Sequence, residues 1–255
     1  MSRIKDAFTD KKAFIAFLTA GDPDYETSLA NFRAVIEAGA DLIEIGIPFS
    51  DPIAEGPVIQ EADIRALSSG MTTDRVFELA AELRRDYDIP MVFMTYANPV
   101  YHYGADVFFE KAAAAGVDGI IIPDCPFEER GEFAETAERH GIDLISMIAP
   151  TSEDRIKTIA SDTKGFIYVV SSLGVTGVRN EITTDLSSIL ALIKEATDTP
   201  AAIGFGISKP EQAERMSKLA DGVIVGSAMV RIVAEYGKDA PKHLAEYVKS
   251  MKAAI

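Results

Sequence analysis

The sequence predicts a (βα)8 barrel, an α/β fold in which eight parallel strands alternate with helices. Short runs rich in Ile and Val alternate with longer amphipathic stretches rich in Ala, Glu, Lys and Arg along the chain, which is the pattern of repeated βα units. Eight such units fall within 255 residues, and about 250 residues is the usual length of this barrel. We therefore expect residues 1–255 to form one barrel domain with a short N-terminal helix.

Eight apolar runs are the predicted strands, and an amphipathic, helix-like segment follows each of them. In chain order the runs are residues 13–19, 42–45, 91–95, 119–122, 144–148, 165–169, 201–203 and 222–225. Each run is short and apolar, as expected for a strand that is covered by helices. No linker, low-complexity tract or second domain interrupts the order.

A local repeat precedes four of these strands. A small or turn-forming segment ends the preceding helix, and an aspartate then opens the strand, at Asp41, Asp118, Asp143 and Asp221. An aspartate in this position can accept hydrogen bonds from loop amides. Because these positions lie at the bottom of the barrel, we interpret them as structural.

Two connections are longer than the others and follow the second and sixth strands. They contain residues 48–66 and 171–185. In this fold the loops that follow strands form the active-site face. The two long loops are therefore candidate lids.

Composition excludes several classes of function. The formal net charge is −15 and the sequence pI is near 4.6, so nucleic acids and anionic membranes would be repelled. Cys125 is the single cysteine, which rules out an intramolecular disulfide and favours the cytoplasm. No apolar run approaches the roughly 20 residues of a membrane helix, and three scattered histidines with one cysteine indicate no metal site.

Two carboxylates flank a Pro- and Gly-rich loop after the second strand. Residues 43–57 read IEIGIPFSDPIAEGP, with Glu44 near the strand end and Glu55 beyond the loop. Alternation puts Leu42 and Glu44 on one side, which we expect to face the barrel interior. Burial there would raise the pKa of Glu44 and suit it to acid and base duty near neutral pH. The structural alternative is an ion pair, but the motif holds no basic residue.

Glycine-rich segments follow the last three strands, at residues 174–177, 204–208 and 226–229. Exposed backbone N–H groups and a helix that begins at Ser227 can form an anion site without Lys or Arg. Each segment alone could be an ordinary tight turn. Together, at consecutive strand ends, they predict a phosphorylated substrate.

Aromatic side chains are expected at the same end of the barrel. Phe17, Tyr96, Tyr168 and Phe205 lie at or just beyond the ends of predicted strands. Individually they are ordinary core residues, but together they could face a planar apolar group. The sequence thus suggests a ligand with an aromatic head and a phosphate tail.

The chain closely resembles the tryptophan synthase alpha subunit family from Phe14 to the C-terminal helix. The most specific motifs are residues 18–23, 43–52, 96–99, 174–177, 204–208 and 226–228. The resemblance implies retro-aldol cleavage of indole-3-glycerol phosphate to indole and glyceraldehyde 3-phosphate. It also implies a heterotetramer with a beta subunit, which receives indole through a tunnel and holds pyridoxal phosphate. This subunit itself would carry no cofactor.

The resemblance also assigns roles to residues. Glu44 would protonate indole C3 and take the glycerol hydroxyl proton, and Glu55 would hold the indole N–H. Asp51 would join Thr176 to link the two lid loops when they close. The remaining substrate-binding positions are Phe17, Tyr96, Tyr168, Thr176 and Phe205 in the pocket, and Gly177, Gly206, Gly226 and Ser227 at the phosphate.

Two positions depart from the family pattern. Many members carry Asp where this chain has Glu55, and the extra methylene lengthens the side chain by about 1.5 Å. Some relatives carry Arg at the position of Ser172, which bears on loop closure. We expect Glu55 to keep its role with a shifted loop.

Three alternatives remain at this point. The chain could be a stand-alone indole-releasing lyase, or a phosphate-ligand sensor that activates a beta partner without catalysis. Indole-glycerol-phosphate synthase, a related barrel, is disfavoured because none of the predicted strands contains the lysine that its chemistry would require.

Overall fold

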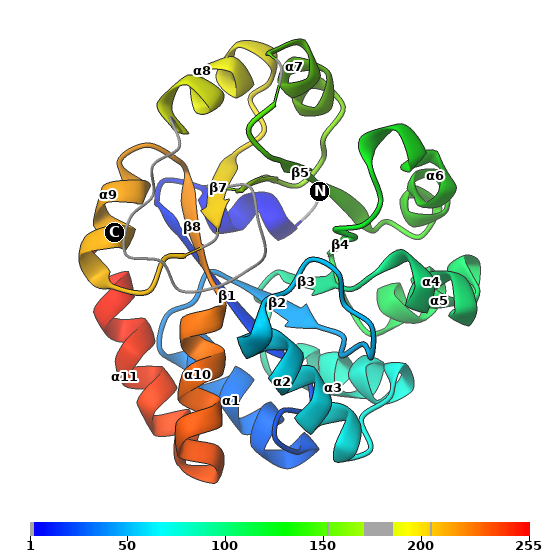
Figure 1. Ribbon diagram of the computed structural model, residues 1–255, viewed down its shortest axis with the longest axis vertical. Coiled ribbons are helices and arrows are strands. Elements are labelled where there is room, and N and C mark those ends of the chain that lie inside the picture. Colours follow the sequence, from blue (N-terminus) through cyan, green and yellow to red (C-terminus); the bar gives the residue numbers. More distant parts are fainter. Residues whose placement is uncertain (1–2, 152, 171–185, 205) are drawn as a thin grey trace.

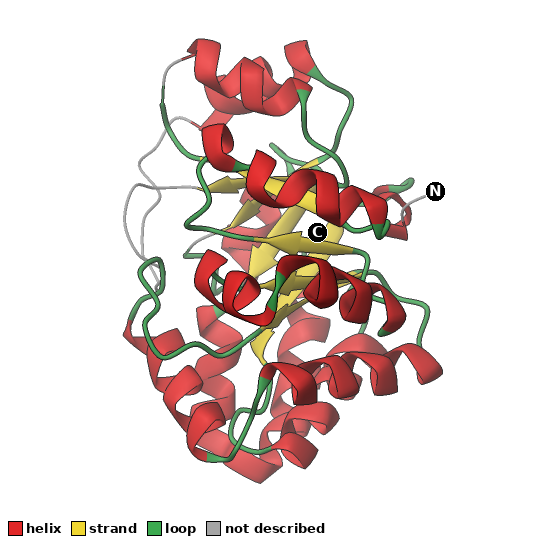
Figure 2. Cartoon of the chain, turned by 90° about the vertical axis from the view of Figure 1, so that its right-hand side faces the viewer, coloured by secondary structure: helices red, strands yellow, loops and turns green. Residues whose placement is uncertain are grey.

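The computed structural model describes residues 3–151, 153–170, 186–204 and 206–255. Eight parallel strands pair in sequence order and close into a barrel between β1 and β8. Helices surround the strands on all sides (Figures 1 and 2). The strands are β1 (Ala13–Thr19), β2 (Leu42–Gly46), β3 (Met91–Met94), β4 (Gly119–Ile121), β5 (Asp143–Ile148), β6 (Ile167–Val170), β7 (Ala201–Gly204) and β8 (Gly222–Val225).

The closed barrel confirms the predicted (βα)8 fold. The bounds of β1 and β8 match the prediction, and the other strands shift by one or two residues. The largest shift is at β6, which begins at Ile167 because Gly165 takes a left-handed turn with φ +71°. A glycine adopts this conformation without the steric cost that a side chain would impose.

The segments between the strands form helices as the amphipathic pattern predicts, and the expected short N-terminal helix is the 3₁₀ helix η1. The loop after β2 is followed by two helices before β3, which accounts for the length of that connection. The predicted long loop after β6 lies in residues 171–185, outside the described residues. The helices are η1 (Arg3–Phe8), α1 (Tyr25–Glu37), α2 (Pro57–Ser68), α3 (Thr73–Asp86), α4 (Ala97–Tyr103), α5 (Ala105–Ala114), η2 (Phe127–Glu129), α6 (Gly131–Arg139), α7 (Glu153–Ser161), α8 (Leu186–Ala196), α9 (Pro210–Ser217), α10 (Ser227–Tyr236), η3 (Gly237–Asp239) and α11 (Ala240–Lys252).

Two apolar clusters separate the inside of the barrel from its outside. Leu42 belongs to the inner cluster together with Ile15 of β1, Val92 of β3 and Ile121 of β4. Ile43 belongs to the outer cluster, which packs the strands against the helices. This arrangement confirms the predicted alternation along β2, and it fixes the side to which Glu44 belongs.

The bottom of the barrel holds the repeated aspartates. Asp41 accepts a hydrogen bond from the Phe14 amide at 2.8 Å, and Asp118 accepts one from the Met91 amide at 2.9 Å. Asp221 accepts one from the Ala201 amide at 3.0 Å. The predicted structural role is therefore seen at these three positions.

The fourth member of the repeat differs. Asp143 Oδ2 is buried and has no hydrogen-bond partner in the described part of the chain. Asp118, in contrast, also binds Arg84 Nη2 at 2.9 Å and Arg3 Nη1 at 2.8 Å. The repeat in the sequence does not by itself specify how many partners each aspartate gains.

Candidate active site

Glu44 lies in the inner wall of the barrel, near the C-terminal end of β2. The strand register places it beside Phe17 of β1 and Val92 of β3. Its side chain follows Leu42 on the inner face, and only 1% of the residue is exposed. As predicted, the Glu44 carboxyl group is buried on the inner face of the barrel, near the C-terminal ends of the strands.

The surroundings of Glu44 favour its neutral form. Glu44 Oε1 has no hydrogen-bond partner among the described residues, and burial raises the pKa of Glu44 to about 8. Burial and the nearby Glu44 charge also raise the pKa of the Tyr168 hydroxyl. A carboxyl group that is protonated at neutral pH and can still ionise is able to donate a proton and then recover it.

Glycines make room for two aromatic rings beside Glu44. A Cβ atom at Gly204 would lie 2.3 Å from Tyr168 Oη, and one at Gly46 would lie 2.7 Å from Phe17 Cζ. At Gly226 it would lie 3.2 Å from Phe17 Cδ1. The structure thus brings the predicted residues Phe17, Tyr168 and Gly226 together. The sequence analysis did not predict Gly46 as a site residue, nor that Gly204 makes room for an aromatic ring. A glycine at the end of an apolar strand is the sequence feature that could have indicated both.

Glu55 lies in the loop between β2 and α2 and is also buried, at 8% exposure. The Tyr96 hydroxyl donates a hydrogen bond of 2.6 Å to Glu55 Oε2 and accepts one from the Ala54 amide at 3.0 Å. Burial raises the pKa of Glu55, the Tyr96 hydrogen bond opposes this rise, and the charge of Asp124 adds to it. Tyr96, predicted as a pocket wall, therefore also holds the second carboxylate.

The predicted phosphate region is described in part. Gly206 has φ +83°, a conformation that favours glycine, and α10 begins at Ser227 directly after Gly226. The first turn of a helix leaves its N–H groups without intrahelical acceptors. Three predicted site residues, Thr176, Gly177 and Phe205, lie outside the described residues, as does Ser172.

Asp51 is exposed in the loop after β2. It accepts a hydrogen bond of 2.5 Å from its neighbour Ser50. Its predicted partner Thr176 is among the residues that are not described, so the proposed link between the two loops stays a prediction.

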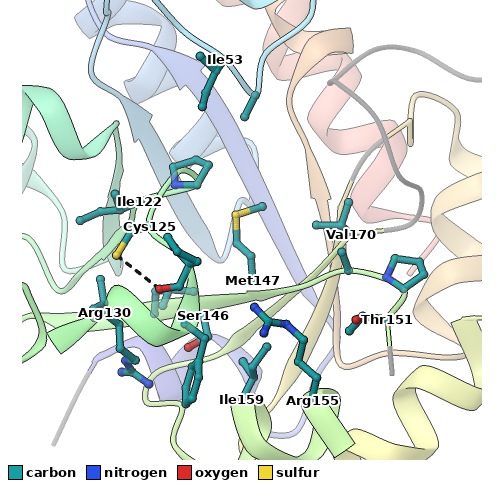
Figure 3. Close-up of a pocket in the computed structure, with 18 residues that line it drawn as sticks. Ile53, Ile122, Cys125, Arg130, Ser146, Met147, Thr151, Arg155, Ile159 and Val170 are labelled. Atoms are coloured by element: carbon teal, nitrogen blue, oxygen red, sulfur yellow. Dashed lines mark hydrogen bonds between the residues drawn. The ribbon is translucent and has the colours of Figure 1, made fainter. Parts of the chain in front are cut away.

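A mainly apolar pocket of about 700 Å³ adjoins the loop that carries Glu55 (Figure 3). Ile53 and Ala54 border it on the loop that carries Glu55, and Met147 and Val170 border it on β5 and β6. Ile53 is 72% exposed. Arg130 and Arg155 also line the pocket, but most of its lining side chains are apolar, which suits a small apolar molecule.

The residues that the structure describes contain no group of three or more His, Cys, Asp or Glu that could hold a metal ion. In the same part of the chain, no helix combines the length and apolar character needed to cross a membrane.

Comparison with known proteins gives consistent matches over nearly the whole chain. The sequence model of a family described as tryptophan synthase alpha chain matches residues 4–255. The tryptophan synthase alpha chain of Lactiplantibacillus plantarum is 51% identical over 256 residues, covering 100% of this chain and 97% of that one.

Solved structures agree. The alpha subunit of tryptophan synthase from Legionella pneumophila is 35% identical, with a TM-score of 0.91 and coverage of 100% of this chain and 98% of that one. A chain in a structure of the tryptophan synthase a2b2 complex of Pyrococcus furiosus is 40% identical, with a TM-score of 0.86 and coverage of 94% and 98%.

Proposed function

Because the chain belongs to the tryptophan synthase alpha chain family, we propose that Glu44 and Glu55 carry out the reaction of that family in this protein. The reaction is the retro-aldol cleavage of indole-3-glycerol phosphate to indole and glyceraldehyde 3-phosphate, a lyase step of L-tryptophan biosynthesis. The observation that carries the proposal is the buried Glu44 carboxyl: no cation pairs with it in the described part of the chain, Phe17 lies beside it in strand register, and its charge raises the pKa of the Tyr168 hydroxyl.

Glu44 acts first as an acid and then as a base. In its neutral form it donates a proton to indole C3, which leaves a positively charged ring and a Glu44 carboxylate. The carboxylate then takes the proton of the glycerol hydroxyl as the carbon–carbon bond breaks, and the bond electrons return to the ring. Indole and the aldehyde are released, and Glu44 is protonated again, so the cycle balances.

Glu55 stabilises the charge that appears on the ring. As an anion it accepts a hydrogen bond from the indole N–H and opposes the positive charge that follows protonation at C3. Tyr96 fixes the position of its carboxylate through the 2.6 Å hydrogen bond. A buried, oriented carboxylate acts more strongly than one in water, because the surrounding dielectric is low.

The other contacts divide between the two ends of the substrate. We assign Phe17, Tyr168 and Tyr96 to the indole ring, and we propose the same role for Phe205 and Thr176, which lie outside the described residues. Gly206, Gly226 and Ser227, together with Gly177, offer backbone N–H groups and the α10 dipole to the phosphate. The supporting observations are the glycine packing beside Glu44 and the start of α10 at Ser227.

The product and the exposed pocket indicate where a partner belongs. The chain works with a tryptophan synthase beta subunit in an alpha2-beta2 complex, as the Pyrococcus furiosus protein does. The alpha reaction uses no cofactor, and pyridoxal phosphate belongs to the beta subunit. We place the docking surface at the rim of the pocket around Ile53 and Phe127, where released indole leaves the barrel. Residues 1–255 act as one domain, in the cytoplasm.

The test is indole release from indole-3-glycerol phosphate by the purified protein, with and without a tryptophan synthase beta subunit. We expect slow release that rises strongly when the beta subunit is added. Fast release without a partner would identify a stand-alone lyase. A protein that raises the beta rate without consuming the substrate would be a sensor, and the proposed roles of Glu44 and Glu55 would be wrong.

A further inference from the structure

Asp63 is a buried acid to which the reaction above assigns no role. It lies in the second turn of α2, on the face that packs against the loop carrying Glu55, and it is 5% exposed. Its neighbours along the helix, Glu61 and Ile64, are exposed. An ionisable side chain is seldom buried unless it is paired or hydrogen-bonded, so its burial beside the site calls for a reason.

The contacts of Asp63 lead to Glu55. The backbone amide of Phe49 hydrogen-bonds the Asp63 carboxyl. The Phe49 ring packs against Tyr96 with centroids 5.5 Å apart, and Tyr96 in turn holds Glu55 at 2.6 Å. Asp63 therefore anchors the front of the loop whose far end carries the second carboxylate.

Among the described residues, the charges that act on Asp63 are negative, and the cation on the same helix is already paired. The charge of Glu55 acts on it from the loop, and that of Asp22 acts from the segment after β1. The cation on the same helix, Arg65, is held by Asp22 through two hydrogen bonds of 2.7 and 2.8 Å. No cation is therefore placed to compensate a charge on Asp63 in the part of the chain described.

We infer that Asp63 is a positioning residue for Glu55 that works as a neutral carboxylic acid, so that the two buried carboxyl groups share one negative charge. The inference rests on the proposed role of Glu55. The charge of Glu55 acts on Asp63, and both side chains are buried, where two ionised carboxylates repel each other more strongly than in water. Glu55 has a strong donor in Tyr96 and keeps the charge, whereas Asp63 holds the loop.

Burial and the charges of Glu55 and Asp22 raise the pKa of Asp63 to about 8, against the opposing effect of the Phe49 amide. Below this pH Asp63 is neutral and Glu55 keeps its place. Above it, a second charge forms beside Glu55 and weakens the contact to Tyr96. Glu44 loses its proton in the same range. At alkaline pH the rate therefore falls because two groups, Glu44 and Asp63, lose their protons.

The first experiment compares Asp63→Asn with Asp63→Leu in the complex with a beta subunit. Asn imitates the neutral acid and can still accept from the Phe49 amide, so we expect it to keep at least about one third of kcat/KM at pH 7. Leu removes the acceptor, and we expect a loss of about tenfold or more. Glu61→Gln, which removes an exposed acid of the same helix, is the matched control. Equal damage by Asn and Leu would overturn the inference.

The pH profile gives a readout that a purely structural role would not move. Above about pH 8, log kcat/KM of the native protein should fall with a slope near two, and that of Asp63→Asn with a slope near one. In a Glu55→Gln background, Asp63→Asn should no longer change the slope. An unchanged slope in the single variant would contradict the inference.

Carbon-13 NMR of labelled Asp side chains separates this inference from the proposed function. Asp63, assigned by its absence in Asp63→Asn, should titrate above pH 7, and Glu55→Gln should lower its pKa. The titration needs no catalysis, so it can succeed even if no indole is released. An Asp63 carboxylate that is already ionised at pH 6 would overturn the inference, whatever the activity.

Discussion

The two ends of the barrel use the same type of side chain in opposite ways. At the bottom, Asp118 is buried between two arginines and a backbone amide, and Asp41 binds Lys11 and Lys252. At the mouth, Glu44 is 1% exposed and Asp63 is 5% exposed, and no cation is paired with either in the described part of the chain. A paired carboxylate fixes the fold, and an unpaired one is free to exchange a proton.

One buried carboxylate at the mouth is paired with a cation, as the carboxylates at the bottom of the barrel are. Asp22 is 3% exposed but is held by Arg65, which joins the segment after β1 to α2. Partners, rather than position alone, therefore decide between structural and chemical use. The variants below test this comparison by removing a carboxyl group at one end of the barrel or at the other.

Removing the acid at Glu44 should have the largest effect. Glu44→Gln keeps the shape of the side chain but can neither donate nor recover the proton, so we expect kcat to fall about a thousandfold. Substrate affinity should change little, as measured by equilibrium binding. Retention of more than a few per cent of the native rate would show that Glu44 is not the acid and base.

Removing an acid at the bottom should affect stability instead. Asp118→Ala leaves Arg84 and the Met91 amide without their buried acceptor, so we expect the free energy of unfolding to fall by about 3 kcal/mol. Urea unfolding measures this loss, and kcat at 25 °C should stay near the native value. A large loss of kcat in a folded Asp118→Ala protein would contradict the division between the two ends.

Glu55→Gln tests the second carboxylate. The amide can still accept from Tyr96 but carries no charge to oppose the positive ring, so we expect kcat/KM to fall about thirtyfold. Glu55→Asp is the matched control for reach, because it keeps the charge and shortens the side chain. A loss of less than about tenfold in Glu55→Gln would remove Glu55 from the mechanism.

The smallest effect is on stability as a function of pH. The folded pKa of Glu44 is raised, to about 8, so its neutral form favours folding at low pH and this advantage is lost as pH rises from about 4.5 to about 8. Relative to Glu44→Gln, the native protein should lose about 1 kcal/mol between pH 6.5 and 7.5. Parallel curves for the two proteins would show that Glu44 is ionised in the folded state.

The sequence predicts this molecule best where the signal is local. The inward position of Glu44 follows from alternation along one strand, and the bottom aspartates follow from a repeat next to each strand start. Asp63 gave no such signal, because an acid in the helical run PVIQEADIRALS resembles any solvated helix residue. Its burial arises only when α2 packs against the loop, a tertiary contact that periodicity does not encode.

The same limit applies to Tyr96 and Gly204. Tyr96 was predicted as a pocket wall, but its hydrogen bond to Glu55 depends on how the loop folds back across the barrel mouth. Gly204 was interpreted through backbone amides, whereas in the structure its missing side chain accommodates Tyr168. The residue types predicted that Tyr96 and Gly204 belong to the site, but their contacts could be assigned only from the three-dimensional packing.

The pairing of β1 with β8 has a consequence for synthesis of the protein. Ala13 lies beside Gly222, so the first strand leaves the ribosome long before the last one exists. Until then one edge of β1 has no strand beside it, and unpaired strand edges recruit other chains. Aggregation of unfinished chains should therefore increase with the rate of synthesis, because more chains with an open β1 edge are then present together.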